Sequence, residues 1–106
     1  MEEQPSRKPD PTDGVALIAA ERRRQVEVKG YDAKADDRSV GGLADIAAIL
    51  VTNQASNPMS FWAVNKAEHI TEKWGNDRIK ILIIAGALIA AEIDRLQRQN
   101  EKRSEP

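Results

Sequence analysis

The feature of this sequence that most constrains its fold is an uncharged run from Ile81 to Ala91, followed directly by Glu92. The run is about half the ~20 residues that a membrane-spanning helix needs, so we expect a helix of a water-exposed domain. At about 100° per residue, two apolar stripes lie on opposite sides of this helix. The first holds Ile79, Leu82, Ile83, Gly86, Ile89, Ala90, Ile93 and Leu96, and the second Ile81, Ile84, Leu88 and Ala91.

A helix that is apolar on two sides must be covered on both sides. We therefore predict that one face of this helix lies in the core and that another, with Ile81, Ile84 and Leu88, contacts a second copy of the chain. Gly86 lies within the run, although glycine in a helix interior costs about 1 kcal/mol relative to alanine. A close crossing with another helix at this point explains its presence.

The composition favours a helical domain and excludes several kinds of site. The chain has 106 residues, of which only 4% are aromatic, and its net charge is −1. Ala, Ile, Leu and Val supply most of the apolar side chains, which is typical of helical cores. The absence of cysteine excludes disulfides, thiolate catalysis and cysteine-ligated metals. The charge balance gives no reason to expect duplex nucleic acid or a membrane as a partner.

The pattern of caps and breaks predicts an all-α bundle of three to four helices with a long C-terminal helix at its centre. One helix starts at Thr12 or Asp13 and ends near Val28, and another runs from Gly42 to Thr52. A short helix or two turns follow before Gly75, and Asn76 or Asp77 caps the final helix. We expect flexible tails over 1–12 and 99–106 and a helical domain over 13–98. No signal peptide is apparent, so we expect a cytoplasmic protein.

Arg22 falls within an inward-facing stripe of the first helix that Val15, Ile18, Ala19 and Val26 define, whereas Glu21, Arg23 and Arg24 point elsewhere. Glu92 continues the second stripe of the last helix, so it is expected to be partly buried and to need a partner. We predict an Arg22–Glu92 ion pair. The alternative is a polar pocket in which Arg22 or Glu92 meets a ligand.

Cationic and aromatic residues offer the means to bind an anionic nucleotide, with guanidinium groups for phosphate and rings for stacking on a base. The predicted ligand contacts are Arg22, Gln25, Tyr31, Trp62, Lys66 and Arg78, within a wider group that also holds Arg23, Arg24, Trp74 and Lys80. We assign no catalytic residue. His69, the single histidine, is interpreted as an exposed or capping residue.

Several segments together resemble a family of small helical phage and prophage proteins. They are "ERRRQVEVKGYDAKADD", "GGLADIAA" and "DRIKILIIAGALIAAEIDRLQR", and the resemblance spans roughly residues 18–98. The matching positions are Glu21, Arg22, Arg24, Gln25, Gly30, Tyr31, Asp36, Asp37, Gly86, Glu92 and Arg95. The chain departs from the family pattern at Gly42, where a Glu is common, and lacks the usual Trp-Pro pair in its middle segment. The resemblance implies a phage accessory protein in the bacterial cytoplasm, a setting in which such proteins often counter host defences.

The predicted function is therefore non-enzymatic inhibition of bacterial immunity by binding, either by sequestering a nucleotide second messenger or by blocking a defence protein. One alternative is a divergent MazG-like nucleotide pyrophosphohydrolase with a Mg²⁺ site at Glu21, Asp36, Asp37 and Glu92. The paired E-x-x-E and E-x-x-D motifs of that class are absent from the sequence. A structural or assembly accessory without a small ligand is the other alternative. Only the MazG-like reading requires a cofactor, Mg²⁺.

Overall fold

The structure is a computed structural model, and it describes residues 12–29, 34, 42–54 and 61–104. Within these residues the chain is all-α, as the sequence predicted. The helices are α1 (Gly14–Glu27), α3 (Gly42–Thr52), α4 (Phe61–Trp74) and α5 (Arg78–Ser104). The segment before Gly75 is thus one continuous helix. α5 continues past Arg98, where we expected the folded part to end, to Ser104.

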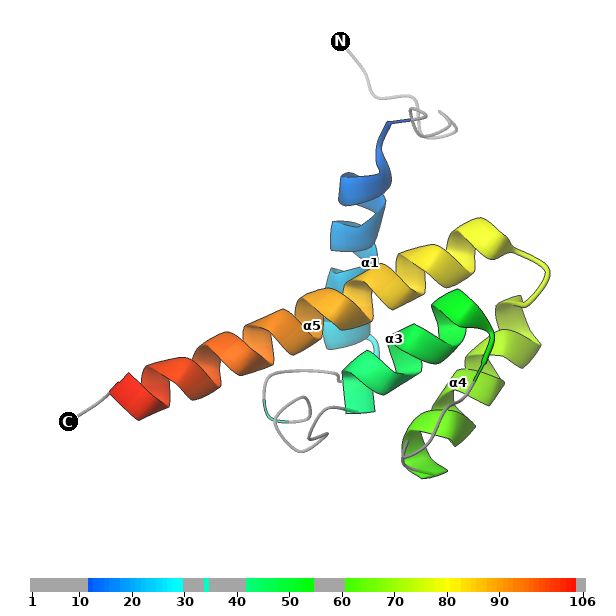
Figure 1. The fold of residues 1–106 in the computed structure, drawn as a ribbon. Helices are drawn as coiled ribbons and strands as arrows, with labels where there is room; N and C mark the ends of the chain where they lie inside the picture. Colours follow the sequence, from blue (N-terminus) through cyan, green and yellow to red (C-terminus); the bar gives the residue numbers. More distant parts are fainter. Residues whose placement is uncertain (1–11, 30–33, 35–41, 55–60, 105–106) are drawn as a thin grey trace, which may run out of the picture.

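The long helix α5 organises the bundle (Figure 1), with α3 packed along its first half, α1 across its middle, and α4 against α3 and α5. The core lies mainly between α3, α4 and one face of α5. We call Ile81, Ile84, Leu88 and Ala91 the core stripe of α5, because each is at most 5% exposed. Its partners are buried side chains of α3 and α4: Leu43, Ile46, Ala47, Ile49, Leu50, Ala63 and Ala67.

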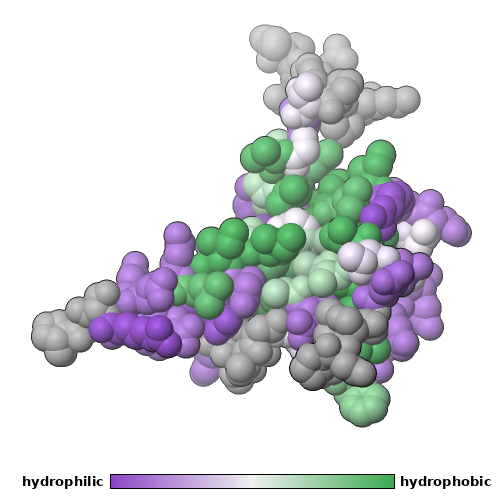
Figure 2. All heavy atoms as spheres, in the orientation of Figure 1, coloured by the Kyte–Doolittle hydropathy of each residue, from purple (hydrophilic) through white to green (hydrophobic). Residues whose placement is uncertain are grey.

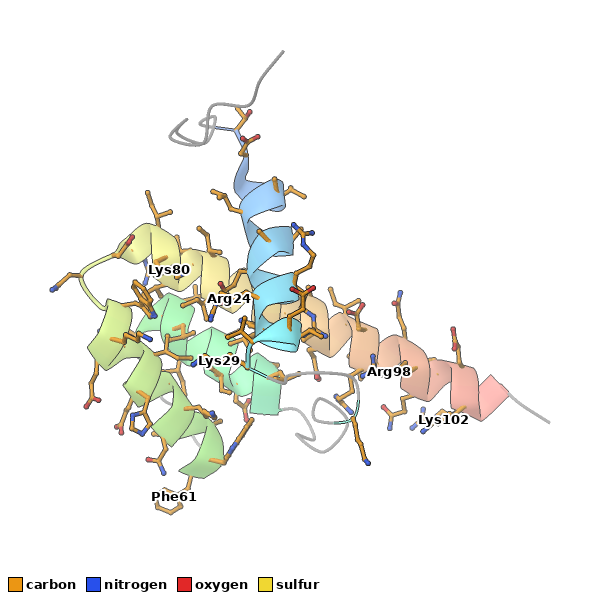
Figure 3. The ribbon with its side chains drawn as sticks, turned by 180° about the vertical axis from the view of Figure 1, so that it is seen from behind. Arg24, Lys29, Phe61, Lys80, Arg98 and Lys102 are labelled. Carbon is orange, nitrogen blue, oxygen red and sulfur yellow. The ribbon has the colours of Figure 1, made fainter. Side chains whose placement is uncertain are left out.

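Helix α1 crosses α5 closely at Gly86, as the sequence predicted. A Cβ atom added at Gly86 would lie 2.6 Å from Cδ1 and 2.9 Å from Cγ1 of Ile18. A side chain at position 86 would therefore force the two helices apart or displace Ile18. Figures 1 and 3 show the crossing from opposite sides, with α1 lying steeply across the middle of α5.

The inward face of α1 agrees with the predicted one at Ile18 and Arg22, which contact α5, and differs from it elsewhere. Val15 is 83% exposed and Val26 is 37% exposed, whereas Glu21 and Gln25 are buried. A helix that crosses its neighbour steeply is covered only near the crossing, so apolar residues at its ends stay in contact with solvent. Glu21 can be buried because basic side chains pair with it, and this polar packing decides which face of α1 turns inward.

On the opposite side of α5, α1 covers the helix at Gly86, and apolar residues before and after this crossing are exposed. Figure 2 shows apolar surface along this helix. We call the exposed residues the outer stripe of α5, and its members, all between 42% and 69% exposed, are Ile79, Leu82, Ile89, Ile93 and Leu96. The two-sided apolar pattern thus resolves into one buried stripe and one exposed stripe. Among the described residues, no helix is both long enough and apolar enough to cross a membrane.

Polar contacts fix the ends of the central helices. The Asp77 side chain accepts a hydrogen bond from the Lys80 backbone N–H at 3.0 Å, which confirms Asp77 as the cap of α5. Arg78 donates from Nη1 to the Leu50 carbonyl at 3.2 Å and from Nη2 to the Val51 carbonyl at 2.6 Å. These carbonyls belong to the last turn of α3, so Arg78 ties the end of α3 to the start of α5.

Candidate functional site

A basic cavity lies between α1, α4 and α5. Its volume is about 200 Å³. Figure 3 shows Arg24, Lys29 and Lys80 gathered on the side of α1 that faces α4 and the start of α5. We call this space the basic cavity, and the residues that line it are Glu21, Arg24, Gln25, Lys29, Lys66, His69, Ile70, Lys73, Trp74, Ile84 and Leu88.

Glu21 is the fixed centre of one wall of the cavity. Arg24, one turn further along α1, donates to both of its carboxylate oxygens, from Nε at 2.9 Å and from Nη2 at 2.7 Å. Lys80 of α5 places its Nζ 3.5 Å from the same carboxylate. The Arg24 hydrogen bonds, together with the charges of Arg24 and Lys80, lower the pKa of Glu21 below its ordinary value despite its burial.

Gln25 lies beside Glu21 and is only 2% exposed. Its Nε2 donates to Glu21 Oε2 at 3.3 Å, and its Oε1 has no hydrogen-bond partner among the described residues. An unpartnered buried oxygen is uncommon in proteins, because removing a polar atom from water without a replacement bond costs free energy. Gln25 lines the cavity, but this oxygen itself has less than 1 Å² of exposed surface and is closed off from it.

The charge around the cavity is mainly positive. Among the described lining residues, Arg24, Lys29, Lys66 and Lys73 are cationic, and Glu21 is the carboxylate that offsets one of these charges. The Trp74 ring adds an aromatic wall, with Lys73 Nζ 5.5 Å and Lys80 Nζ 5.0 Å from its centre. His69 is exposed, as expected, and lies 3.9 Å from Glu72. The cavity is suited to a small anion with a flat ring.

The cavity unites two of the predicted ligand contacts, Gln25 and Lys66. Arg22 is not a lining residue, because its Nη2 points to Asp94 of α5 at 3.8 Å. Glu92 is partly buried as predicted, but Arg95 holds both of its oxygens, at 2.8 and 2.9 Å. The predicted Arg22–Glu92 pair is therefore corrected to two separate pairs, and the inward carboxylate of α1 is Glu21.

Two further predicted contacts have structural positions outside the cavity. Trp62 covers the start of α3, where its ring lies within 2.5 Å of a Cβ added at Gly42. This close approach explains why glycine suits position 42. Arg78 binds the end of α3 rather than lining the cavity. The sixth predicted contact, Tyr31, lies outside the described residues.

The ion pairs made by the predicted metal-ligating carboxylates argue against the Mg²⁺ site. Glu21 is held by Arg24 and Lys80, and Glu92 by Arg95, so the oxygens that Mg²⁺ requires already accept other bonds. Within the described part of the chain, no group of three or more His, Asp or Glu residues is placed to hold a metal ion. Asp36 and Asp37, the other two predicted ligands, fall in the part of the chain that the structure leaves undescribed.

The wall that α4 contributes was mostly missed from the sequence. Lys66, Ile70 and Lys73 are four and three residues apart, which places them on one helical face. That spacing could have indicated that these three residues line the same site. The basic residue Lys29, just beyond α1, gave no such signal, because its position depends on the crossing of α1 and α5.

Comparison with known proteins does not extend these findings. No protein-family model, curated protein or solved structure matches this chain.

Proposed function

We propose that this protein is a non-enzymatic binding protein that holds a small anionic ligand, a nucleotide or part of one, in the basic cavity. The observation that carries the proposal is the combination of four cationic side chains and the Trp74 ring around one space. Basic groups favour phosphate, and the indole favours a base or another flat ring. Both oxygens of Glu21 are occupied, so this carboxylate stabilises the wall rather than acting on a substrate.

The size of the cavity limits the ligand. A water molecule occupies about 30 Å³ in the liquid, so a space of about 200 Å³ has room for roughly seven waters. A ring with its nearest substituents fits that space, whereas the remainder of a cyclic oligonucleotide must lie outside. The exposed lysines of the rim, Lys29 and Lys73, are placed to bind phosphates there.

The biological setting rests on the resemblance to small phage and prophage proteins. In that setting the protein is an anti-defence factor in the bacterial cytoplasm that sequesters a nucleotide second messenger. The cavity favours this route over direct obstruction of a defence protein, because obstruction requires no such internal site.

The outer stripe of α5 supports the proposal that the protein is a homo-oligomer. Its members are separated by three, seven, four and three residues, and the gap of seven holds Gly86, where α1 crosses, so the stripe is exposed before and after that crossing. The stripe runs along a helix of 27 residues, about 40 Å long at about 1.5 Å per residue. Ile81, Ile84 and Leu88, which we expected to meet a second copy, are covered by the chain itself, so we place the association face on the outer stripe instead.

A ligand screen by thermal denaturation tests the binding function. The probes are nucleoside mono- and triphosphates and cyclic di- and oligonucleotides. A ligand at a hundred times its Kd stabilises the fold by about 2.7 kcal/mol, which raises the Tm of a small domain by several degrees. Lys66→Ala and Lys73→Ala are expected to reduce the shift. Lys102→Ala, at the far end of α5 from Lys80 in Figure 3, is the matched control. A screen with no response contradicts the proposal.

Incubation with nucleoside triphosphates and Mg²⁺ separates binding from catalysis. We expect the nucleotides to be recovered unchanged. Release of monophosphate that Glu21→Gln abolishes would establish the MazG-like reading instead.

A further inference from the structure

We propose that the basic cavity selects nucleotides with at least two phosphate groups, and that these phosphates bridge α1 to α4 through Lys29 and Lys73. The inference rests on the proposed function and deepens it, because it states how many phosphates the site requires and which two helices they join.

The basic cavity lies between two helices whose backbones stay apart. No Cα atom of α1 lies within 8 Å of a Cα atom of α4, and each of these helices packs against α5. Side chains from both helices nevertheless line the same space, Arg24 from α1 and Lys66 and Trp74 from α4 among them. A molecule that fills the cavity therefore contacts two helices that are otherwise joined through α5.

The two sides of the cavity carry charge of the same sign. Lys29 follows the end of α1, whereas Lys66 and Lys73 belong to α4. Arg24 is paired with Glu21, so these three lysines supply the excess of positive charge. A phosphate monoester carries only about 1.5 to 2 negative charges at neutral pH. One phosphate thus leaves part of the excess without a counter-charge, and a second phosphate offsets it.

The lysines are also spread around the cavity rather than gathered at one point. Lys66 and Lys73 are seven residues apart, which is about 10 Å along α4 at about 1.5 Å per residue. The Nζ atom of Lys73 lies 5.5 Å from the centre of the Trp74 ring, at the aromatic wall. Lys29 lines the cavity from the side of α1. An extended anion matches this arrangement better than a single phosphate does.

A bridging ligand should also restrain α1. Among the described helices, α1 approaches only α5, and Val15 and Val28 near its two ends are exposed. A ligand bound to both Lys29 and Lys73 adds an attachment at the end of α1 that the helix otherwise lacks. The backbone amides near this end should therefore exchange their hydrogens more slowly when the bridge forms.

The first test compares nucleotides that differ in the number of phosphates. The ligands are the 5′-mono-, di- and triphosphates of adenosine, guanosine, cytidine and uridine. Titration calorimetry with the full chain gives a Kd for each, in the absence of Mg²⁺ because the ion would neutralise phosphate charge. For at least one base, we expect the diphosphate to bind about tenfold more tightly than the monophosphate, which corresponds to about 1.4 kcal/mol.

Substitutions then locate the two ends of the bridge. Lys29→Ala and Lys73→Ala should each bring the Kd values of the mono- and diphosphate together. Arg23→Ala removes a positive charge from an exposed position of α1 that does not line the cavity, and should leave the preference unchanged. Hydrogen exchange at the end of α1 should be slower with the diphosphate than with the monophosphate at equal saturation. In Lys73→Ala, a change on α4, that difference should disappear.

Four outcomes overturn the inference. If mono- and diphosphates bind wild-type protein equally, the need for a second phosphate is wrong while the proposed function stands. If Arg23→Ala lowers the preference as much as Lys29→Ala, general attraction to a positive surface replaces the bridge. If both ligands slow exchange in α1 equally, the second phosphate does not join the helices. If no nucleotide of any series binds, the nucleotide-binding function itself fails, and the inference fails with it. Because each preference is measured within one protein, a general loss of stability in a variant does not imitate the expected result.

Discussion

Glu21 and Gln25 hold the centre of α1 against the bundle, although neither side chain is apolar. Glu21 is 5% exposed and carries a negative charge into the interface between α1 and α5. Burial of a lone carboxylate is unfavourable, but Arg24 and Lys80 supply two positive charges at short range. The ionised carboxylate and its basic partners therefore contribute to the stability of this interface.

Glu21→Gln is expected to destabilise the fold by about 2 kcal/mol at neutral pH, since it removes charge-assisted hydrogen bonds to Arg24. The pKa of Glu21 is lowered in the folded state, so its contribution is fully present above its ordinary value of 4.5. The contribution is lost as the pH falls through the lowered folded-state pKa. Urea denaturation at several pH values should show wild type and variant converging as the pH falls below about 4.5.

The exposed Glu27, at the end of the same helix, provides the matched control. Glu27→Gln should change the free energy of unfolding little at any pH, because surface charges contribute little. A difference between wild type and Glu21→Gln that stays constant down to acid pH would show that the carboxylate acts through its shape rather than its charge.

The contact between Gly86 and Ile18 allows a second test at single residues. Gly86→Ala should cost a net of about 1 kcal/mol, because overpacking against Ile18 outweighs the gain in helix propensity. In an Ile18→Ala background the same change should stabilise the protein by about 1 kcal/mol, since the clash is gone and the propensity gain remains. Thermal or urea denaturation of wild type, the two single variants and the double variant gives the coupling energy between positions 18 and 86. Equal effects in both backgrounds would contradict a close crossing.

The sequence predicts that the helices exist, and roughly where they begin and end, better than it predicts which face of each helix turns inward. The final helix, its cap at Asp77 and the close crossing at Gly86 follow from local patterns of apolar residues, caps and glycine. The inward face of α1 does not follow fully from such local patterns. Its apolar residues Val15 and Val26 lie away from the crossing, and the buried positions are polar ones whose partner, Lys80, is distant in sequence.

For the candidate site too, the sequence predicted the types of residue better than their arrangement. Cationic and aromatic residues were expected to gather at one site, and Gln25 and Lys66 of the predicted contacts line the cavity. Arg22 and Arg78 were expected beside them for their chemistry alone. Both guanidinium groups are engaged by other elements, one with Asp94 and the other with the end of α3. Which of several arginines meets a ligand depends on how helices cross, and one sequence does not contain that geometry.

Arg78 offers a test of how helices α3 and α5 are joined. Arg78→Met retains the apolar stem but removes the bonds to the Leu50 and Val51 carbonyls, so we expect a loss of about 1–2 kcal/mol in the free energy of unfolding. Nucleotide affinity of the folded variant should be unchanged, because Arg78 does not line the cavity. Arg103→Met, at an exposed position near the end of the same helix, is the control. A large loss of nucleotide affinity without a loss in the free energy of unfolding would indicate that Arg78 contacts the ligand.

For the whole molecule, the outer stripe of α5 bears on whether the protein is a monomer or an oligomer. The last part of α5, beyond Ala91, extends away from the other helices in Figure 1, and Ile93 and Leu96 lie exposed on it. Short isolated helices are only marginally stable in water, so this segment gains from contact with another apolar helix. In an antiparallel pair of α5 helices formed beyond the α1 crossing, the segments from Ile89 to Leu96 of the two copies would lie against each other.

Ile89→Glu and Ile93→Glu are expected to separate the copies, since each places a charge in the middle of the outer stripe and removes an apolar contact. Sedimentation velocity at increasing concentration should show wild type shifting to the mass of a dimer or larger assembly, while both variants stay at the monomer mass. Val15→Glu changes a residue that is 83% exposed on α1, away from the stripe, and should associate like wild type. A wild-type chain that remains monomeric at high concentration would contradict self-association. Nucleotide binding would then be a property of one chain, because every lining residue of the basic cavity comes from the same copy.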